Sequence, residues 1–167
     1  TQTDPSDPNT FSFLTQNAAE GVNHGLEIKM DMDINESLSA FVNLGILKTE
    51  IKNWQSRQDL EGRAQAHAPE RSFALGLNWA PTSHTYLAID FTGKSRFYYS
   101  DSHNNKSKSY VLINLNLGYV KNNWNYELWA RNIFDEYYSV RGFYFGNEAP
   151  NFIDTLYERH GDPRHIG

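Results

Sequence analysis

The segment Thr92-Gly93-Lys94-Ser95 is the stretch of this chain most similar to a known phosphate-binding motif. Its Gly-Lys-Ser run matches the end of a P-loop, in which backbone amides and a lysine hold phosphate groups. A P-loop also needs a glycine five positions before Gly93, where this chain has Ala88. In addition, the segment falls on a predicted strand, whereas a P-loop connects a strand to a helix. The sequence therefore predicts no nucleotide site here.

Histidines and carboxylates are the other groups that could bind a metal or catalyse proton transfer. No two of the six histidines have the His-x-x-x-His spacing of a metal site. They are His24, His67, His84, His103, His160 and His165. The acidic residues Asp31, Asp33, Asp90 and Glu127 share a predicted polar face, where we expect solvated charges. The chain contains no cysteine, which excludes thiolate ligands and disulfides. We expect no enzymatic activity, no metal site and no cofactor.

Aromatic and cationic side chains in the predicted long loops are the remaining candidates for chemistry. Aromatic faces and guanidinium donors suit an anionic ligand such as a catecholate chelate. The candidate ligand-binding residues are Trp54, Arg57, Arg63, Tyr98, Tyr99, His103, Arg141, Tyr144, Tyr157, Arg159 and His160. Each of them is also compatible with an ordinary solvated loop position, so their placement in the fold decides between the two interpretations.

Composition excludes several classes of partner. The 167 residues include 15 Lys plus Arg and 20 Asp plus Glu, which give a net charge of −5. No segment gathers positive charge into a stripe that could neutralise phosphates, so no nucleic acid partner is expected. No apolar run approaches the ~18 residues of a membrane helix. Aromatic residues make up 14% of the chain, which argues against disorder.

Alternation of apolar and polar residues predicts the secondary structure. In the segment 22–34 most even positions are apolar, whereas Glu27, Lys29, Asp31 and Asp33 occupy odd positions. A period of two is typical of a strand with one apolar face. The same pattern recurs in segments 38–46, 72–79, 86–92, 111–119 and 124–131. We also expect a shorter strand at 10–16 and the opening of another at 164–167, and no helix of comparable strength.

The connections alternate in length along the chain. Short turns are predicted near residues 35–36, 81–83 and 121–123, and long loops at about 51–70, 98–109 and 133–163. Because successive strands of a meander run antiparallel, all short turns must lie at one end of the sheet and all long loops at the other. The predicted sheet therefore has two unequal ends.

Strand length and aromatic placement favour a membrane barrel. Strands of about 9 to 12 residues match the length of a tilted bilayer crossing. Aromatic residues also gather near the strand ends, as barrel girdles do. The predicted fold is all-β, an antiparallel up-and-down meander of about seven long strands whose apolar side faces lipid. A soluble antiparallel β-sandwich that binds carbohydrate, or an outer-membrane barrel enzyme, remains an alternative.

Residues 126–138 resemble a segment of the TonB-dependent outer-membrane receptors. In that family the penultimate strand ends in Asn-Leu-Phe-Asp followed by a Tyr pair, and here Ile133 replaces the leucine. The run Gly161-Asp162-Pro163-Arg164 is similar to the family's Gly-x-Pro-Arg entry into the final strand, and segments 68–71 and 141–143 also fit the family. The motif residues are Asn132, Phe134, Asp135, Tyr137, Tyr138, Gly161, Pro163 and Arg164.

The motif residues have physical roles that do not require a ligand. Asn132 and Asp135 carry short acceptor side chains that can bond to backbone amides where a strand ends. Phe134 and the tyrosine pair suit the height of the membrane interface. Pro163 has no backbone N–H, so it suits the first residue of a strand. We therefore expect these residues to shape the barrel rim.

The resemblance implies a fragment of a 22-stranded transmembrane β-barrel. Residues 1–167 would be the C-terminal part of the barrel domain, with no plug domain and with a truncated final strand. Such receptors import a scarce nutrient, most often a ferric siderophore, across the outer membrane of a Gram-negative bacterium. The implied partners are outer-membrane lipid, TonB through the absent plug region, and a metal chelate or other small ligand at the extracellular loops. The isolated fragment is expected to self-associate through its open strand edges.

Overall fold

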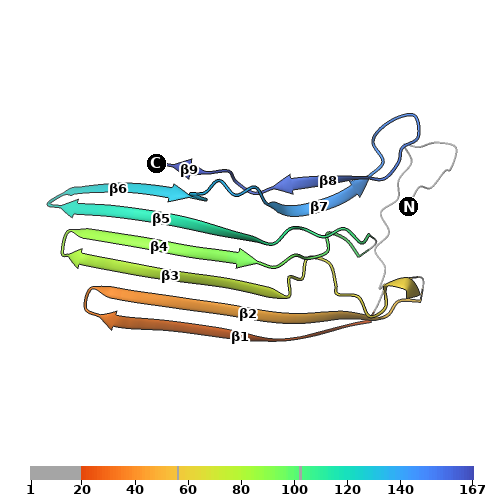
Figure 1. Ribbon diagram of the computed structural model, residues 1–167, viewed down its shortest axis with the longest axis horizontal. Helices are drawn as coiled ribbons and strands as arrows, with labels where there is room; N and C mark the ends of the chain where they lie inside the picture. Colours follow the sequence, from red (N-terminus) through yellow and green to blue (C-terminus); the bar gives the residue numbers. More distant parts are fainter. Residues whose placement is uncertain (1–19, 56, 102) are drawn as a thin grey trace.

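The computed structural model describes residues 20–167 apart from residues 56 and 102 (Figure 1). One antiparallel sheet contains β1 (Glu20–Asn35), β2 (Leu38–Asn53), β3 (Arg71–Thr82), β4 (Thr85–Lys94), β5 (Tyr110–Lys121), β6 (Trp124–Arg131) and β9 (His165–Ile166), in that order. A separate two-stranded sheet contains β7 (Ser139–Phe145) and β8 (Thr155–His160). The strand expected at residues 10–16 lies outside the described residues. The antiparallel meander predicted from the alternation is confirmed.

Strand pairing keeps each face of the sheet chemically uniform. Between β4 and β5, Ile89 lies opposite Leu115 on one face, and Asp90 lies opposite Asn114 on the other. Asn114 Nδ2 donates a 2.7 Å hydrogen bond to Asp90 Oδ2. Because a slip of one residue would move every aliphatic group to the polar face, this pattern specifies the register.

The two ends of the sheet differ as predicted. Short turns join β1 to β2, β3 to β4 and β5 to β6 at one end, and the long connections all lie at the other (Figure 1). The β3–β4 turn is centred on residues 83–84, slightly later than the expected 81–83. The strand β2 extends to Asn53, beyond the predicted end at residue 46, because β1 pairs with it along its whole length.

Two strands were missed inside the loop expected at 133–163. The hairpin of β7 and β8 has a register shift between Ser139 and Arg141, and Gly142 interrupts β7. Charged Arg141 and apolar Phe143 share one face, so the hairpin shows no alternation of polarity. The first long loop also contains a short 3-10 helix, η1 (Gln58–Leu60). Neither element has a period that the sequence pattern could reveal.

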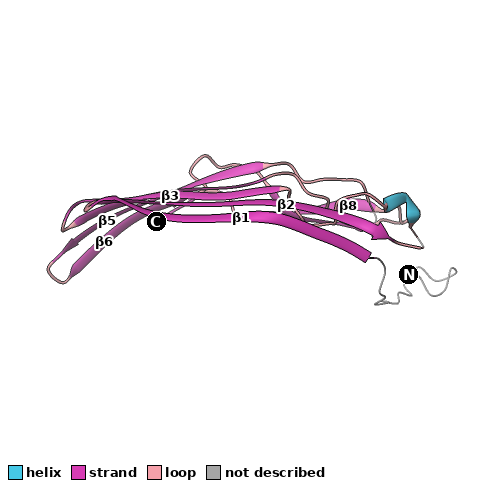
Figure 2. Ribbon diagram, turned by 90° about the horizontal axis from the view of Figure 1, so that it is seen from below, coloured by secondary structure: helices cyan, strands magenta, loops and turns pink. Residues whose placement is uncertain are grey.

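The sheet is a single curved layer whose apolar face has no protein partner among the described residues (Figure 2). Large aliphatic groups along β1 are exposed, and Leu26 reaches 58%. The buried hydrophobic residues of the described chain are Ile51, Leu60, Phe97 and Tyr99, all at the long-loop end. The apolar faces of two sheets do not pack together, so the sandwich alternative is wrong.

The helical content of the described residues is limited to one short turn. No helix in this part of the chain is long and apolar enough to cross a membrane.

Candidate functional site

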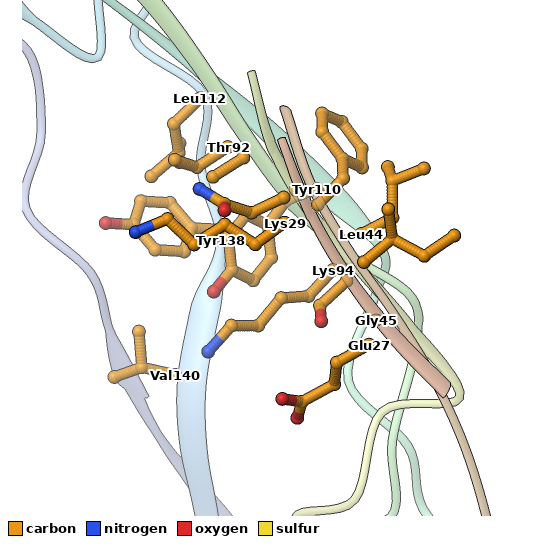
Figure 3. Close-up of a pocket in the computed structure, with 16 residues that line it drawn as sticks. Glu27, Lys29, Leu44, Gly45, Thr92, Lys94, Tyr110, Leu112, Tyr138 and Val140 are labelled. Atoms are coloured by element: carbon orange, nitrogen blue, oxygen red, sulfur yellow. The ribbon is translucent and has the colours of Figure 1, made fainter. Parts of the chain in front are cut away.

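A cavity of about 820 Å³ lies on the polar face of the sheet, toward the long-loop end. It spans strands β1 to β5 and the segment that precedes and begins β7. Its polar and aromatic lining includes Glu27, Lys29, Asn43, Ser72, Thr92, Lys94, Tyr110 and Tyr138. Figure 3 shows Glu27 and Lys94 extending from the sheet toward the segment that bears Tyr138 and Val140. The cavity therefore lies between the strand wall and the start of the last long loop.

The charged and phenolic groups of this cavity are the ammonium groups of Lys29 and Lys94, the Glu27 carboxylate and two tyrosines. Lys29 Nζ lies 3.8 Å from Asp31 Oδ2, a long contact between two exposed side chains. Lys94 forms no ion pair with any described residue, so its ammonium group can bind an anionic ligand. The rings of Tyr110 and Tyr138 lie 4.5 Å apart, centroid to centroid. Ammonium and phenol donors beside aromatic faces suit an anionic ligand rich in oxygen.

Sequence reasoning did not select the cavity residues as ligand contacts. The alternation placed Lys29 on the polar face, and Lys94 follows the parity of the polar residues in its own strand, two residues beyond the predicted segment 86–92. It did not show at what height along the strands a cavity would form. That height depends on Tyr138 and Val140, which come from a distant segment of the chain.

Five of the predicted ligand-binding residues gather at the loop end, but they mainly contact one another and neighbouring protein groups. These residues, called the Tyr99 cluster below, are Arg63, Tyr98, Tyr99, His103 and Tyr144. The Arg63 guanidinium lies 4.3 Å from the centre of the Tyr98 ring and donates to the carbonyl oxygens of Ser100 and His103. The His103 and Tyr144 rings stack at 3.6 Å. The cluster therefore fixes the loops in place.

Tyr99 joins the second long loop to the β7–β8 hairpin. Its side chain is only 3% exposed and lies edge-on to Phe97, with ring centres 5.9 Å apart. A Cβ atom on Gly142 would come within 2.6 Å of the Tyr99 ring, so the absence of a side chain at Gly142 allows this packing. The Tyr99 hydroxyl donates to the Glu158 carboxylate. Little of Tyr99 is left for a ligand to contact.

The Tyr99–Glu158 contact predicts a pH window for docking of the hairpin. Burial and the bond to Glu158 raise the pKa of Tyr99 to about 12, and the bond from Tyr99 holds the pKa of Glu158 below its usual 4.5. The protonated phenol stabilises the docked hairpin fully below pH 10, and this stabilisation is lost as the pH rises toward 12. The ionised Glu158 carboxylate stabilises the docked hairpin fully above pH 4.5, and this stabilisation is lost as the pH falls below 4.5.

A nitroxide label at Thr155→Cys on β8 reports this docking. We expect an immobilised label between about pH 4.5 and 10 and increased mobility on either side. Tyr99→Phe removes the hydrogen bond to Glu158, so the label should be more mobile between pH 4.5 and 10. The mobility of the label should also change less with pH. Identical pH profiles in both proteins would contradict the assigned role of Tyr99.

The other predicted ligand-binding residues are spread over two regions. Arg57 binds Asp59 through two hydrogen bonds of 2.9 and 3.0 Å, and half-buried Trp54 precedes it in the first long loop. Arg141, Tyr157, Arg159 and His160 all belong to the β7–β8 hairpin. The structure thus divides the candidates among the first loop, the Tyr99 cluster and the hairpin.

The motif residue Asn132 connects three segments of the chain. It is 5% exposed and has a left-handed φ of 48°, a conformation that asparagine tolerates. Its Nδ2 donates to the carbonyl oxygens of Glu136 and Asp162, and its Oδ1 accepts from the Glu136 amide. Asp135 Oδ1 accepts a 2.8 Å hydrogen bond from the Arg164 amide. These bonds join the end of β6 to the entry into β9.

The remaining motif residues surround this junction. A Cβ atom on Gly161 would approach the Tyr138 ring to 2.0 Å, so only glycine leaves room for that ring. Phe134 and Tyr137 are both 73% exposed, as girdle aromatics are, whereas Tyr138 lines the cavity. Pro163 comes two residues before β9 and is not its first residue. We interpret the motif as a structural junction.

Metal ligands do not gather in the described part of the chain. No three residues among its histidines, aspartates and glutamates lie close enough together to hold a metal ion.

Comparison with known proteins decides the family. Residues 1–133 match the model of the family described as TonB dependent receptor-like, beta-barrel. The chain belongs to the TonB-dependent receptor β-barrel family. Members of this family are transporters of the Gram-negative outer membrane and are not enzymes. The barrel-enzyme alternative is therefore wrong, and the single-layered sheet is part of an outer-membrane barrel.

Three solved receptor structures share the fold. The siderophore receptor PiuA from Acinetobacter baumannii superposes with a TM-score of 0.73 at 16% identity, covering 89% of this chain and 21% of that one. The ferric yersiniabactin uptake receptor FyuA from Yersinia pestis gives 0.75 at 14% identity, covering 90% and 23%. The ferric-catecholate import receptor Fiu from E. coli gives 0.67 at 19% identity, covering 89% and 20%. The chain thus spans about a fifth of the length of these receptors.

Proposed function

We propose that this chain is the C-terminal part of the barrel domain of a receptor that imports a ferric siderophore with energy supplied through TonB. Membership in the receptor family supports the transport class, and the siderophore receptors with the same fold support the ligand class. In this function the strands form the barrel wall, and the long loops with the adjoining cavity form a vestibule. Contact with TonB would reside in a plug region outside these residues.

The polar-face cavity is the observation that supports this proposal most strongly. It lies at the long-loop end, which is the extracellular end of such barrels. Lys94, which has no ion-pair partner within the described part of the chain, offers cationic and aromatic contacts to an anionic chelate together with Lys29, Tyr110 and Tyr138. Lys29, Lys94 and Tyr110 lie in strands of the paired sheet, so that these contacts are already in place before the ligand arrives.

Transport by the full-length receptor tests the proposed ligand contact. In cells whose only siderophore receptor is this one, Lys94→Gln should reduce the affinity for uptake of a radio-iron-labelled chelate about tenfold, because a charge-assisted hydrogen bond contributes about 1.5 to 3 kcal/mol. Lys121→Gln is the matched control, since Lys121 ends β5 at the opposite, short-turn end. Equal affinities in the two variants would contradict a role for the cavity.

Energy coupling requires a separate test. Uptake by the wild-type receptor should disappear in cells that lack TonB, while binding of the labelled chelate at the cell surface should remain. Uptake that persists without TonB would contradict the proposed coupling and leave the cavity assignment unaffected.

A further inference from the structure

Two arginines face each other across the β7–β8 hairpin. Arg141 is the direct register partner of Arg159. Directly opposed residues of an antiparallel pair project from the same face with Cβ atoms about 4.5 to 5.5 Å apart. Both arginines are exposed, and neither has an ion pair or hydrogen-bond partner within the described residues. The hairpin therefore concentrates two uncompensated positive charges.

The same face of the hairpin offers aromatic surface and no carboxylate. The next pairs on that face are Phe143 with Tyr157 and Phe145 with Thr155. The Phe143 and Tyr157 rings stack with centroids 5.7 Å apart, and Phe143 is 47% exposed. Glu158, the only acidic residue of the two strands, is on the opposite face and accepts the Tyr99 bond. Within the two strands, no acid on this face neutralises the arginine pair.

Packing elsewhere in the hairpin holds the two like charges together. Opposed like charges destabilise a strand pair. The contact of Gly142 with Tyr99 and the Tyr99–Glu158 bond fix one face of the hairpin. At its base, the Tyr137 hydroxyl lies 2.6 Å from His160 Nε2, where one group donates to the other. The arginines are thus presented on a fixed scaffold and do not need to be brought together by a ligand.

The arginine pair lies next to the polar-face cavity along the chain. Val140 lines that cavity, and the Cα atom of Arg141 follows that of Val140 at about 3.8 Å. Neither arginine lines the cavity itself, so the pair would be a separate contact beside it. Under the proposed function the imported ligand is soluble, and the proposal commits to such a ligand over a phosphate group fixed in the lipid layer.

We propose that Arg141 and Arg159 form a binding site for a soluble ligand bearing carboxylate or phosphate groups beside an apolar or aryl part. Guanidinium groups bind such oxyanions through paired hydrogen bonds, and two adjacent groups match a ligand with two anionic centres. The stacked Phe143 and Tyr157 rings contact the apolar part. The inference deepens the proposed function and rests on it, because this site would select the anionic class of the imported ligand.

Binding of inorganic pyrophosphate to the purified full-length receptor tests the site. The wild-type receptor should bind pyrophosphate, and Arg141→Gln or Arg159→Gln should each weaken the affinity about tenfold. Arg71→Gln is the control, because Arg71 is an exposed arginine at the start of β3, away from the hairpin. Thermal unfolding should show that both hairpin variants remain folded, since each substitution removes a repulsion.

The outcomes separate the site from its alternatives. Equal pyrophosphate affinity in the hairpin variants and in Arg71→Gln would overturn the proposal. So would a result in which the arginines affect only adhesion to vesicles containing lipid A, because the ligand would then be a lipid phosphate. A receptor that fails to import siderophores, yet needs both arginines for pyrophosphate binding, would overturn the proposed function and leave the anion site in place.

Discussion

Replacing Leu115 with lysine is expected to destabilise the assembled receptor by about 2 to 4 kcal/mol. Leu115 lies in the middle of β5, opposite Ile89, on the face that we assign to the hydrocarbon. A lysine there must place its ammonium group in lipid or distort the strand to reach water. Equilibrium unfolding of the full-length receptor in lipid vesicles, followed by tryptophan fluorescence, measures the loss.

The neighbouring residue is the control for this substitution. Asn116 projects from the opposite face, where its Nδ2 donates a 2.5 Å hydrogen bond to Glu127 Oε1. A lysine at Asn116 can pair with the same carboxylate, so Asn116→Lys should change stability little. If the two lysine variants lose stability to the same extent, the assignment of the faces is wrong.

Asn132→Ala is expected to destabilise the barrel rim by about 4 kcal/mol. The substitution removes three side-chain hydrogen bonds, each contributing about 0.5 to 1.5 kcal/mol, and leaves the Glu136 amide without its side-chain partner. Alanine also tolerates the φ of 48° poorly, which adds about 1 kcal/mol. Urea unfolding of the full-length receptor in detergent measures the change.

Two further variants at Asn132 separate the contributions. Asn132→Gly relieves the backbone strain but not the lost bonds, so it should be about 1 kcal/mol less damaging than alanine. Asn132→Asp keeps the acceptor for the Glu136 amide but removes both donated bonds. Should all three variants unfold like the wild type, the junction between β6 and β9 would not depend on Asn132.

The long strands could be predicted from the sequence because one physical constraint governs each of their residues. Each residue of β5 faces either an apolar or a polar medium, so Ile113, Leu115 and Leu117 alternate with Asn114 and Asn116. The same constraint predicts the two unequal ends of the sheet, because antiparallel strands place alternate connections at opposite edges. Local pattern was therefore enough for the fold.

The hairpin and the site could not be predicted in the same way. The hairpin is positioned by contacts such as Gly142 with Tyr99, between residues 43 positions apart, and no local period records them. Tyr98 and Tyr99 are adjacent in the sequence and were predicted to have the same role, but Tyr99 is buried against the hairpin. Lys94 lines the cavity together with Tyr138, a residue 44 positions away along the chain.

The central claim is that the aliphatic side of the sheet contacts hydrocarbon and the polar side contacts water. Nitroxide labels on single cysteines at positions 113 to 117 of the receptor in a bilayer test it directly, since this chain has no cysteine of its own. We predict that labels at Ile113, Leu115 and Leu117 collide mainly with oxygen, which concentrates in lipid. Labels at Asn114 and Asn116 should collide mainly with a water-soluble nickel complex. Labels at the three aliphatic positions that are shielded from both reagents would show a protein interior there and contradict the claim.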